Sequence, residues 1–126
     1  MMDSNSLDFQ QARIKQILFK SQLRSVLYGV READDALFSP QGNALGQWLS
    51  TVIKPKFPLR AEVREAERLL QNMLGTGREL AAQYRRGQIE EARQGLTQID
   101  RLGEQLVAVL QRLGQEPRPG GAAASY

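Results

Sequence analysis

Apolar residues recur along this chain at intervals of three, four and seven residues, the spacing that places side chains on one face of an α-helix. The pattern covers four segments, 7–30, 40–52, 59–86 and 88–113, and none of them shows the strict apolar–polar alternation of a strand. Each segment is therefore predicted to be an amphipathic helix. The clearest stripe lies in the last segment and consists of Ile89, Ala92, Leu96, Ile99, Leu102, Leu106, Val109, Leu110 and Leu113.

The other three segments carry stripes of the same kind. In the first segment the inward face is predicted to consist of Leu7, Ile14, Ile17, Leu18, Val26, Leu27 and Val30. In the second it consists of Leu45, Trp48, Leu49 and Val52. In the third it consists of Val63, Ala66, Leu69, Leu70, Met73, Leu74, Leu80, Ala81 and Tyr84.

Proline, serine and glycine predict the ends of these helices. Ser39 and Pro40 predict the start of the second helix, with Ser39 as the N-cap and Pro40 in the first turn. Pro55 and Pro58 predict its end, because proline lacks the amide hydrogen that a helix interior needs. Gly87 predicts the end of the third helix as a C′ glycine.

The helices together predict an all-α fold, a four-helix bundle with three long helices and one short second helix. The bundle domain is expected to span 7–114, between a disordered N-terminus over 1–6 and a disordered Gly/Pro/Ala tail over 115–126. Gly75 and Gly77 fall inside the third helix, where each is expected to mark a bend or the close approach of a neighbouring helix.

The composition removes several classes of function. The chain of 126 residues has no cysteine and no histidine, which excludes disulfides, thiolate metal sites and His-assisted nucleophiles. A formal net charge of +3 is spread along the chain, so no nucleic-acid partner is expected. No apolar run approaches the length that spans a bilayer, and the N-terminus lacks the pattern of a signal peptide. We therefore expect a cytoplasmic protein that does not bind a membrane.

An enzymatic function has little support from the sequence. The adjacent acidic pairs Asp34–Asp35 and Glu90–Glu91 point in different directions on a helix, so their carboxylates do not converge. A hydrolase or transferase that uses carboxylates alone would need a buried Asp/Glu pair with raised pKa values in a cleft. We expect no enzyme activity and no cofactor.

Three short motifs resemble those of one family. The first helix contains Phe19–Lys20, the second contains LGQW at 45–48, and ELAAQYRRGQIEEA at 79–92 leads into the last helix. Over residues 14–113 the chain resembles the chemoreceptor zinc-binding (CZB) domains. These are cytoplasmic four-helix bundles attached to bacterial chemoreceptors and diguanylate cyclases, in which three His and one Cys bind zinc.

The resemblance places other residues at the zinc-ligand positions. Counting from the motifs, Gln16 stands at the first His, Asn43 at the Cys, and Leu70 and Leu74 at the His-x-x-x-His pair. We refer to these residues as the four aligned positions. Leucine cannot ligate a metal and neutral amides are poor zinc ligands, so no tetrahedral zinc site is expected. Packed leucines and an amide hydrogen bond would replace the metal.

The resemblance implies a non-enzymatic regulatory or interaction module of bacterial signal transduction, of the chemotaxis or cyclic-di-GMP type. Its expected partner is a protein of a signalling pathway, and the chain is expected to form a homodimer. Phe19, Gly46 and Trp48 are predicted to be packing anchors. One alternative is a small-molecule sensor with a ligand pocket near Trp48, lined also by Gln16 and Asn43. Another is an unrelated helical-bundle adaptor that binds proteins.

Overall fold

The computed structural model describes residues 4–114, and every regular element within that range is helical. The long helices are α1 (Ser4–Leu27), α5 (Ala61–Arg85) and α7 (Leu96–Gly114), and α7 is preceded by α6 (Ile89–Gln94). Between α1 and α5 lie the short helices α2 (Asp35–Phe38), α3 (Ala44–Trp48) and α4 (Lys54–Lys56), with the π-helical turn η1 (Leu49–Ile53) joining α3 to α4.

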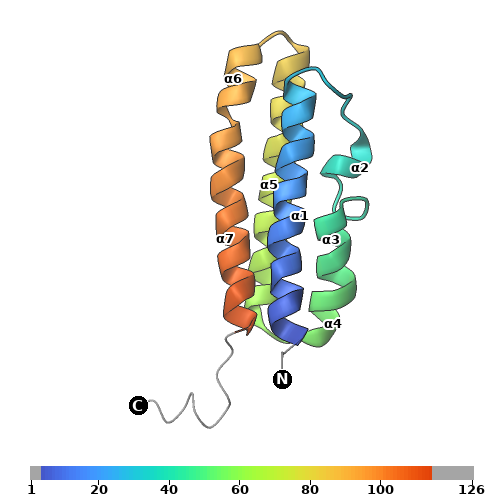
Figure 1. The fold of residues 1–126 in the computed structure, drawn as a ribbon, viewed down its shortest axis with the longest axis vertical. Helices are drawn as coiled ribbons and strands as arrows, with labels where there is room; N and C mark the ends of the chain where they lie inside the picture. The colour runs from blue at the N-terminus through green and yellow to red at the C-terminus, as the bar shows by residue number, and fades with distance from the viewer. Residues whose placement is uncertain (1–3, 115–126) are drawn as a thin grey trace.

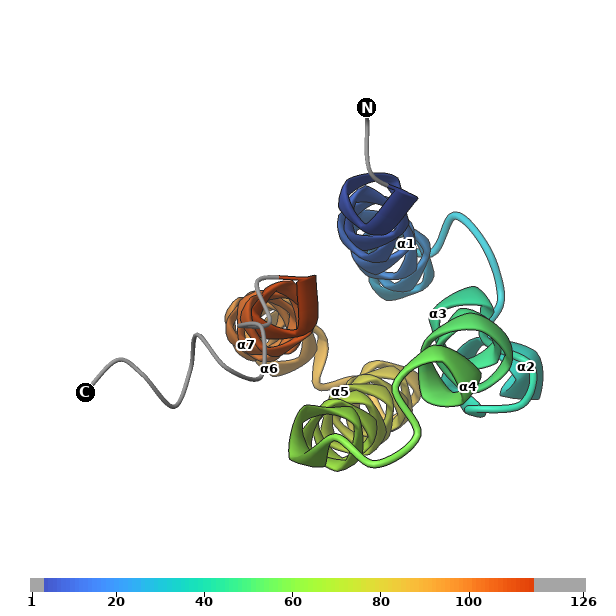
Figure 2. The same cartoon turned by 90° about the horizontal axis from the view of Figure 1, so that it is seen from below.

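The long helices lie side by side, and the short ones cover one flank (Figure 1). Seen end-on, α1, α5, α7 and the α3–α4 segment surround a shared centre (Figure 2). Their inward side chains form one apolar cluster that includes Phe19, Leu45, Leu70 and Leu110. The first helix starts at Ser4, before the predicted start of the domain at 7, and the predicted tail over 115–126 lies outside the described residues.

The first helix buries only part of the face that we predicted: Val26 and Leu27 are buried, whereas Val30 after the helix is exposed. Phe9, Ala12, Gln16, Phe19, Leu23 and Val26 are buried and follow a strict three–four spacing. Ile14, Ile17 and Leu18, which the apolar count assigned to the core, are exposed. The helix therefore carries apolar residues on two faces, and the predicted set left out Phe9, Ala12 and Leu23 of the buried face.

The second predicted helix begins later and ends later than its prolines suggested. Ser39 ends α2, and its backbone C=O accepts hydrogen bonds from the N–H groups of Gly42 (3.1 Å) and Asn43 (2.8 Å). Pro40 therefore lies in a turn, and helix α3 starts only at Ala44. Pro55 does not end the helix, because it sits in the first turn of α4, where a missing N–H is tolerated.

The last two predicted helices agree closely with the structure, except for one interruption. Helix α5 spans nearly all of 59–86, and Gly87 follows it with a positive φ of 88°, as expected for a C′ glycine. The predicted helix over 88–113 is divided at Gly95 into α6 and α7. A Cβ at Gly95 would lie 3.0 Å from Cδ1 of Leu80, so α5 approaches closely here. Ile89, predicted to face inward, is exposed.

No helix within residues 4–114 combines the length and apolar content that crossing a bilayer requires.

The two glycines inside α5 have different surroundings, which gives a matched pair of substitutions. Gly75 faces open space, whereas a Cβ at Gly77 would lie 3.1 Å from Cζ of Phe19 and 3.2 Å from Cε1 of Phe38. Gly75→Ala is expected to raise the free energy of unfolding by about 0.5–1 kcal/mol, because alanine favours the helix. Gly77→Ala is expected to give no such increase in the free energy of unfolding, because the new methyl group would crowd the rings of Phe19 and Phe38. Urea denaturation followed by circular dichroism measures both, and equal gains would contradict the close approach.

Candidate functional site

All four aligned positions are buried in the core. The exposed fraction of the residue is 4% for Gln16, 5% for Asn43, 3% for Leu70 and 2% for Leu74. Gln16 and Asn43 are also the two buried polar residues among the side chains described from 9 to 114. The burial of a polar amide is unfavourable unless its groups form hydrogen bonds or pack closely against neighbours. The contacts of Gln16 and Asn43 therefore show how the structure tolerates these two buried amides.

Asn43 uses its whole amide to organise the start of the second helical segment. Its Oδ1 accepts hydrogen bonds from the backbone N–H groups of Leu45 (2.9 Å) and Gly46 (3.4 Å), which makes it the N-cap of α3. Its Nδ2 donates to the backbone C=O of Leu37 in α2 (2.7 Å). One side chain thereby joins α2 to α3 across the intervening turn.

Gln16 lies at the crossing of α1 and α7, against Gly103. A Cβ at Gly103 would lie 2.8 Å from Cγ of Gln16 and 2.6 Å from its amide carbon, and closer still to Nε2. The missing side chain of Gly103 therefore makes room for the amide. No hydrogen bond joins this amide to another residue of the described part of the chain. Gln16 and Asn43 are thus held by different partners, Gly103 and the α2–α3 backbone.

Leu70 and Leu74 stand one turn apart on α5 and belong to the apolar core cluster. Their side chains offer no donor atom to a metal. Within residues 4–114 no group of three or more His, Cys, Asp and Glu residues is placed to hold a metal ion. No acidic side chain is buried among residues 9–114, so the buried carboxylate pair that a carboxylate-only enzyme would need is not found in this range.

The predicted packing anchors all take part in close contacts or in the core. Phe19 meets Phe38 edge-on, with ring centroids 6.4 Å apart. Gly46 lies against the backbone of Pro40, whose carbonyl carbon would be 2.9 Å from a Cβ at this position. Trp48 is buried in the core cluster at the end of α3. Gly46 is therefore needed to fold the 39–43 turn back onto α3.

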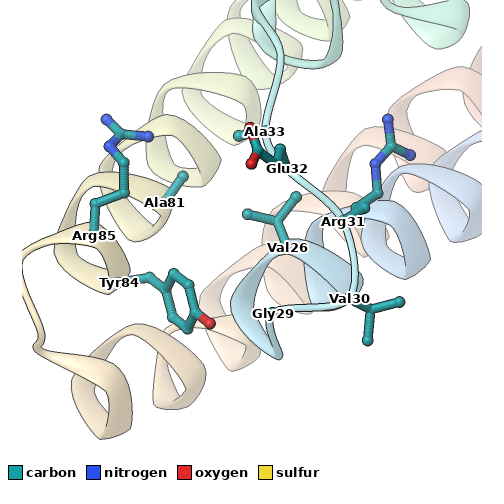
Figure 3. A pocket seen from close by; sticks show the side chains of 9 residues that line it. All are labelled: Val26, Gly29, Val30, Arg31, Glu32, Ala33, Ala81, Tyr84 and Arg85. Atoms are coloured by element: carbon teal, nitrogen blue, oxygen red, sulfur yellow. The ribbon is translucent and has the colours of Figure 1, made fainter.

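A cleft of about 600 Å³ lies elsewhere, between the C-terminal ends of α1 and α5 and the loop that follows α1 (Figure 3). None of the four aligned positions lines it, and neither does Trp48. Small residues create the hollow, and the ring of Tyr84 projects into it (Figure 3). The lining residues are Val26, Gly29, Val30, Arg31, Glu32, Ala33, Ala81, Tyr84 and Arg85.

The charged groups of the cleft are of both signs. Arg31 pairs with Asp34 at 3.4 Å and points away from Tyr84, and Arg85 stands on the opposite rim (Figure 3). Glu32 extends from the loop between them (Figure 3). The sequence reasoning missed this cleft, because its lining comes from two distant segments and the only local signal was a glycine after a helix end.

Arg93 is a second residue that the sequence reasoning missed. Its Nε donates a hydrogen bond to the backbone C=O of Leu27 at the end of α1 (2.8 Å), and its guanidinium lies 4.0 Å from the ring centroid of Tyr28. This places a cation at a helix C-terminus, where the unpaired carbonyls are electronegative. Arg93 therefore ties α6 to the end of α1 that borders the cleft.

One carboxyl group in the first turn of α5 has a displaced pKa. The hydrogen bond from Nε of Arg60 to Oε1 of Glu62 (3.2 Å) holds the pKa of Glu62 below its ordinary value, and a backbone hydrogen bond adds to the effect. This carboxylate lies in the first turn of α5, where a negative charge is favourable at the helix N-terminus.

Comparisons with family models, with curated proteins and with solved structures gave no match for this chain. The functional argument therefore depends on the residues and geometry described above.

The hydrogen bonds of Asn43 give a direct prediction. Asn43→Ala removes one buried donor and one buried acceptor, so we expect the free energy of unfolding to fall by about 1–3 kcal/mol. Asn72→Ala is the matched control, because Asn72 is exposed on α5 and the same change there favours the helix. Chemical denaturation measures both. A loss at Asn72 as large as that at Asn43 would contradict the assigned cap.

The contact between Gln16 and Gly103 can be tested by a double-mutant cycle. Gly103→Ala alone is expected to destabilise the protein by about 1–3 kcal/mol, because the new methyl group overlaps the buried glutamine. In the Gln16→Ala background the overlap is gone, and Gly103→Ala is expected to be neutral or stabilising. The two effects should therefore be coupled, and simple additivity within about 0.5 kcal/mol would show that the residues do not constrain each other.

Proposed function

We propose that this protein is a metal-free relative of the CZB domains and acts as a non-enzymatic regulatory or interaction module in bacterial signal transduction. The observation that carries the proposal is the burial of all four aligned positions, two of which are the buried polar residues of the described side chains. An alignment made on motifs alone thus selects positions in the core, including a glutamine and an asparagine that no apolar pattern would place there.

The chemistry of the proposed relation is a replacement of metal ligation by packing. In the proposed four-helix bundle, the second helix is the continuous segment α3–η1–α4 and the fourth is α6–α7. Asn43 stands at the position of a zinc-binding thiolate and caps a helix in place of binding metal. Leu70 and Leu74 contribute apolar volume where the family has two imidazoles. Such a module responds through helix packing and contacts with other proteins rather than through zinc.

The proposed partners are a signalling protein and a second copy of the chain, in the cytoplasm. The cations are spread over the surface and many are paired with acids, as in Lys20–Asp100 (2.6 Å) and Arg112–Glu65 (3.0 Å). This distribution does not favour nucleic-acid binding, which requires clustered and unpaired cationic side chains.

A second candidate function is small-molecule sensing, and the cleft beside Tyr84 is the observation that favours it. Its volume is in the range of ligand sites, and it combines an aromatic ring with charged groups of both signs. This places the candidate ligand at the end of α1 and α5 rather than near Trp48, which is buried in the core. A helical protein-binding adaptor unrelated to the CZB domains is the third candidate.

Restoring the ligands tests the proposed function. The variant Gln16→His, Asn43→Cys, Leu70→His, Leu74→His is expected to bind one zinc ion and to gain stability on zinc addition, whereas the unmodified chain does neither. Binding to the folded state alone stabilises it by about 2.7 kcal/mol at a hundredfold excess of zinc over Kd. Calorimetry and thermal denaturation measure the two effects, and folding that depends on zinc would count as binding.

The control keeps Gln16→His and Asn43→Cys but moves the His pair to the exposed positions Arg68 and Asn72, which have the same spacing. Zinc affinity of the restored variant no higher than that of this control would overturn the proposed relation. Tight stoichiometric binding of zinc by the unmodified chain would overturn the metal-free part. For the signalling role, the chain can replace the CZB domain of a diguanylate cyclase. Cyclase activity should then be unchanged by zinc in the fusion with the unmodified chain. It should change on zinc addition in the fusion with the restored variant.

A further inference from the structure

The cleft between the ends of α1 and α5 has fixed walls, because both helices end in the same hydrogen-bonded cap. After α1, the N–H of Gly29 donates to the C=O of Val26 (3.1 Å) and the N–H of Val30 donates to the C=O of Ser25 (2.8 Å). Gly29 has a positive φ of 76°, and these two bonds around it form a Schellman motif. The same pair of bonds closes α5 around Gly87. The cleft is therefore preformed, which lowers the cost of ordering its walls when a ligand binds.

The inner lining of the cleft is apolar, and a phenol hydroxyl projects into it. Val26 and Ala81 are buried and Ala33 is half-buried. A Cβ at Gly29 would lie 2.7 Å from Oη of Tyr84, so the absence of a side chain at Gly29 leaves room for the ring. The Tyr84 hydroxyl forms no hydrogen bond with another residue in the described part of the chain. An apolar or aromatic group of a ligand can therefore pack on this lining beside the ring.

Three charged residues line the cleft, and one of them is already neutralised. Arg31 pairs with Asp34 at 3.4 Å. Glu32 and Arg85 form no ion pair, either with each other or with any other residue between 4 and 114. Glu32 stands on the loop wall and Arg85 on the α5 wall, on the two sides of the opening (Figure 3). The cleft thus offers a ligand one anionic and one cationic group.

We propose that the cleft binds a small zwitterion with an apolar side chain, a free amino acid or a dipeptide. Its ammonium group lies at Glu32, its carboxylate lies at Arg85, and its side chain packs beside Tyr84. A ligand with a carboxylate alone would leave Glu32 uncompensated, and a ligand with an amine alone would leave Arg85 uncompensated. A ligand with both charges forms a charge-assisted hydrogen bond on each wall.

The inference rests on the small-molecule sensing proposed for this cleft and adds the chemical class of the ligand. Four probes test it: phenylalanine, the dipeptide alanyl-phenylalanine, 3-phenylpropionate, which lacks the ammonium group, and phenethylamine, which lacks the carboxylate. Titrations followed by the NMR shifts of the backbone amides in 26–33 and 81–85 give each Kd and show where the probe binds.

The tighter of the two zwitterions is expected to have a Kd about tenfold lower than either probe with a single charge, because each of those loses one charge-assisted hydrogen bond. The comparison of phenylalanine with the dipeptide decides which source supplies the ligand. A single-charge probe that binds as tightly as the better zwitterion would overturn the inference.

Substitutions of the two charged residues test the direction of binding. Glu32→Gln is expected to raise the Kd of the zwitterion and of phenethylamine by about three- to tenfold, without weakening 3-phenylpropionate. Arg85→Gln is expected to weaken the zwitterion and 3-phenylpropionate, without weakening phenethylamine. Glu90→Gln and Arg86→Gln are the matched controls, because both residues are exposed and neither lines the cleft. Circular dichroism checks the fold of each variant, and variants that bind the zwitterion as tightly as the unmodified chain would overturn the assigned contacts.

The remaining outcomes separate this inference from the proposed functions. If a single-charge probe binds in the cleft as tightly as the zwitterions, recognition of a zwitterion is overturned and small-molecule sensing stands. If none of the four probes binds at concentrations up to about 10 mM, the inference is overturned. Small-molecule sensing is then decided by a screen of chemically mixed compounds for shifts of the same amides. The zinc experiments concern the core and depend on neither result.

Discussion

The contact between Gln16 and Gly103 decides which face of α1 turns inward. Helix α7 lacks a side chain at residue 103, and the buried amide of Gln16 fills that space. The rotation of α1 that allows this contact also buries Phe19 and Leu23 and leaves Ile14 and Ile17 in solvent. A different rotation would cover those aliphatic residues but would withdraw the glutamine from the space at Gly103. The orientation of α1 therefore agrees both with this contact and with the burial of its large apolar residues.

Asn43 has the corresponding role in the shorter part of the chain. Its amide joins the end of α2 to the start of α3, and Gly46 lets the turn around Pro40 fold back onto the helix. These contacts hold α3 in position, so that Trp48 enters the core. The two buried amides thus act through different contacts, Gln16 by steric fit between α1 and α7 and Asn43 by hydrogen bonds between α2 and α3. This use of both residues is consistent with the proposal that a former metal site has become part of the packing.

In the proposed regulatory role the aligned positions are core, so a response would arise at the surface or in the cleft. The outer face of α1 and the cleft beside Tyr84 are connected through the end of α1, where Arg93 binds the backbone of Leu27 and covers Tyr28. A ligand in the cleft would therefore contact the C-terminal end of α1.

Periodicity and capping chemistry predicted the all-helical architecture, α5, and most of α6 and α7, because long amphipathic stripes and a C′ glycine are local signals. The motifs also selected Gln16 and Asn43, which hydropathy alone would have placed on the surface.

Local signals were insufficient for other features of the fold. Pro40 and Pro55 mark helix ends in general, but the hydrogen bonds of Asn43 and the π-helical turn at Leu49–Ile53 moved both boundaries. The inward face of α1 was decided only by tertiary structure, because both faces of that helix are apolar and the choice depends on Gly103, nearly ninety residues away. The cleft required the same long-range folding, since its two walls are distant in the chain and meet only when α1 and α5 pack together.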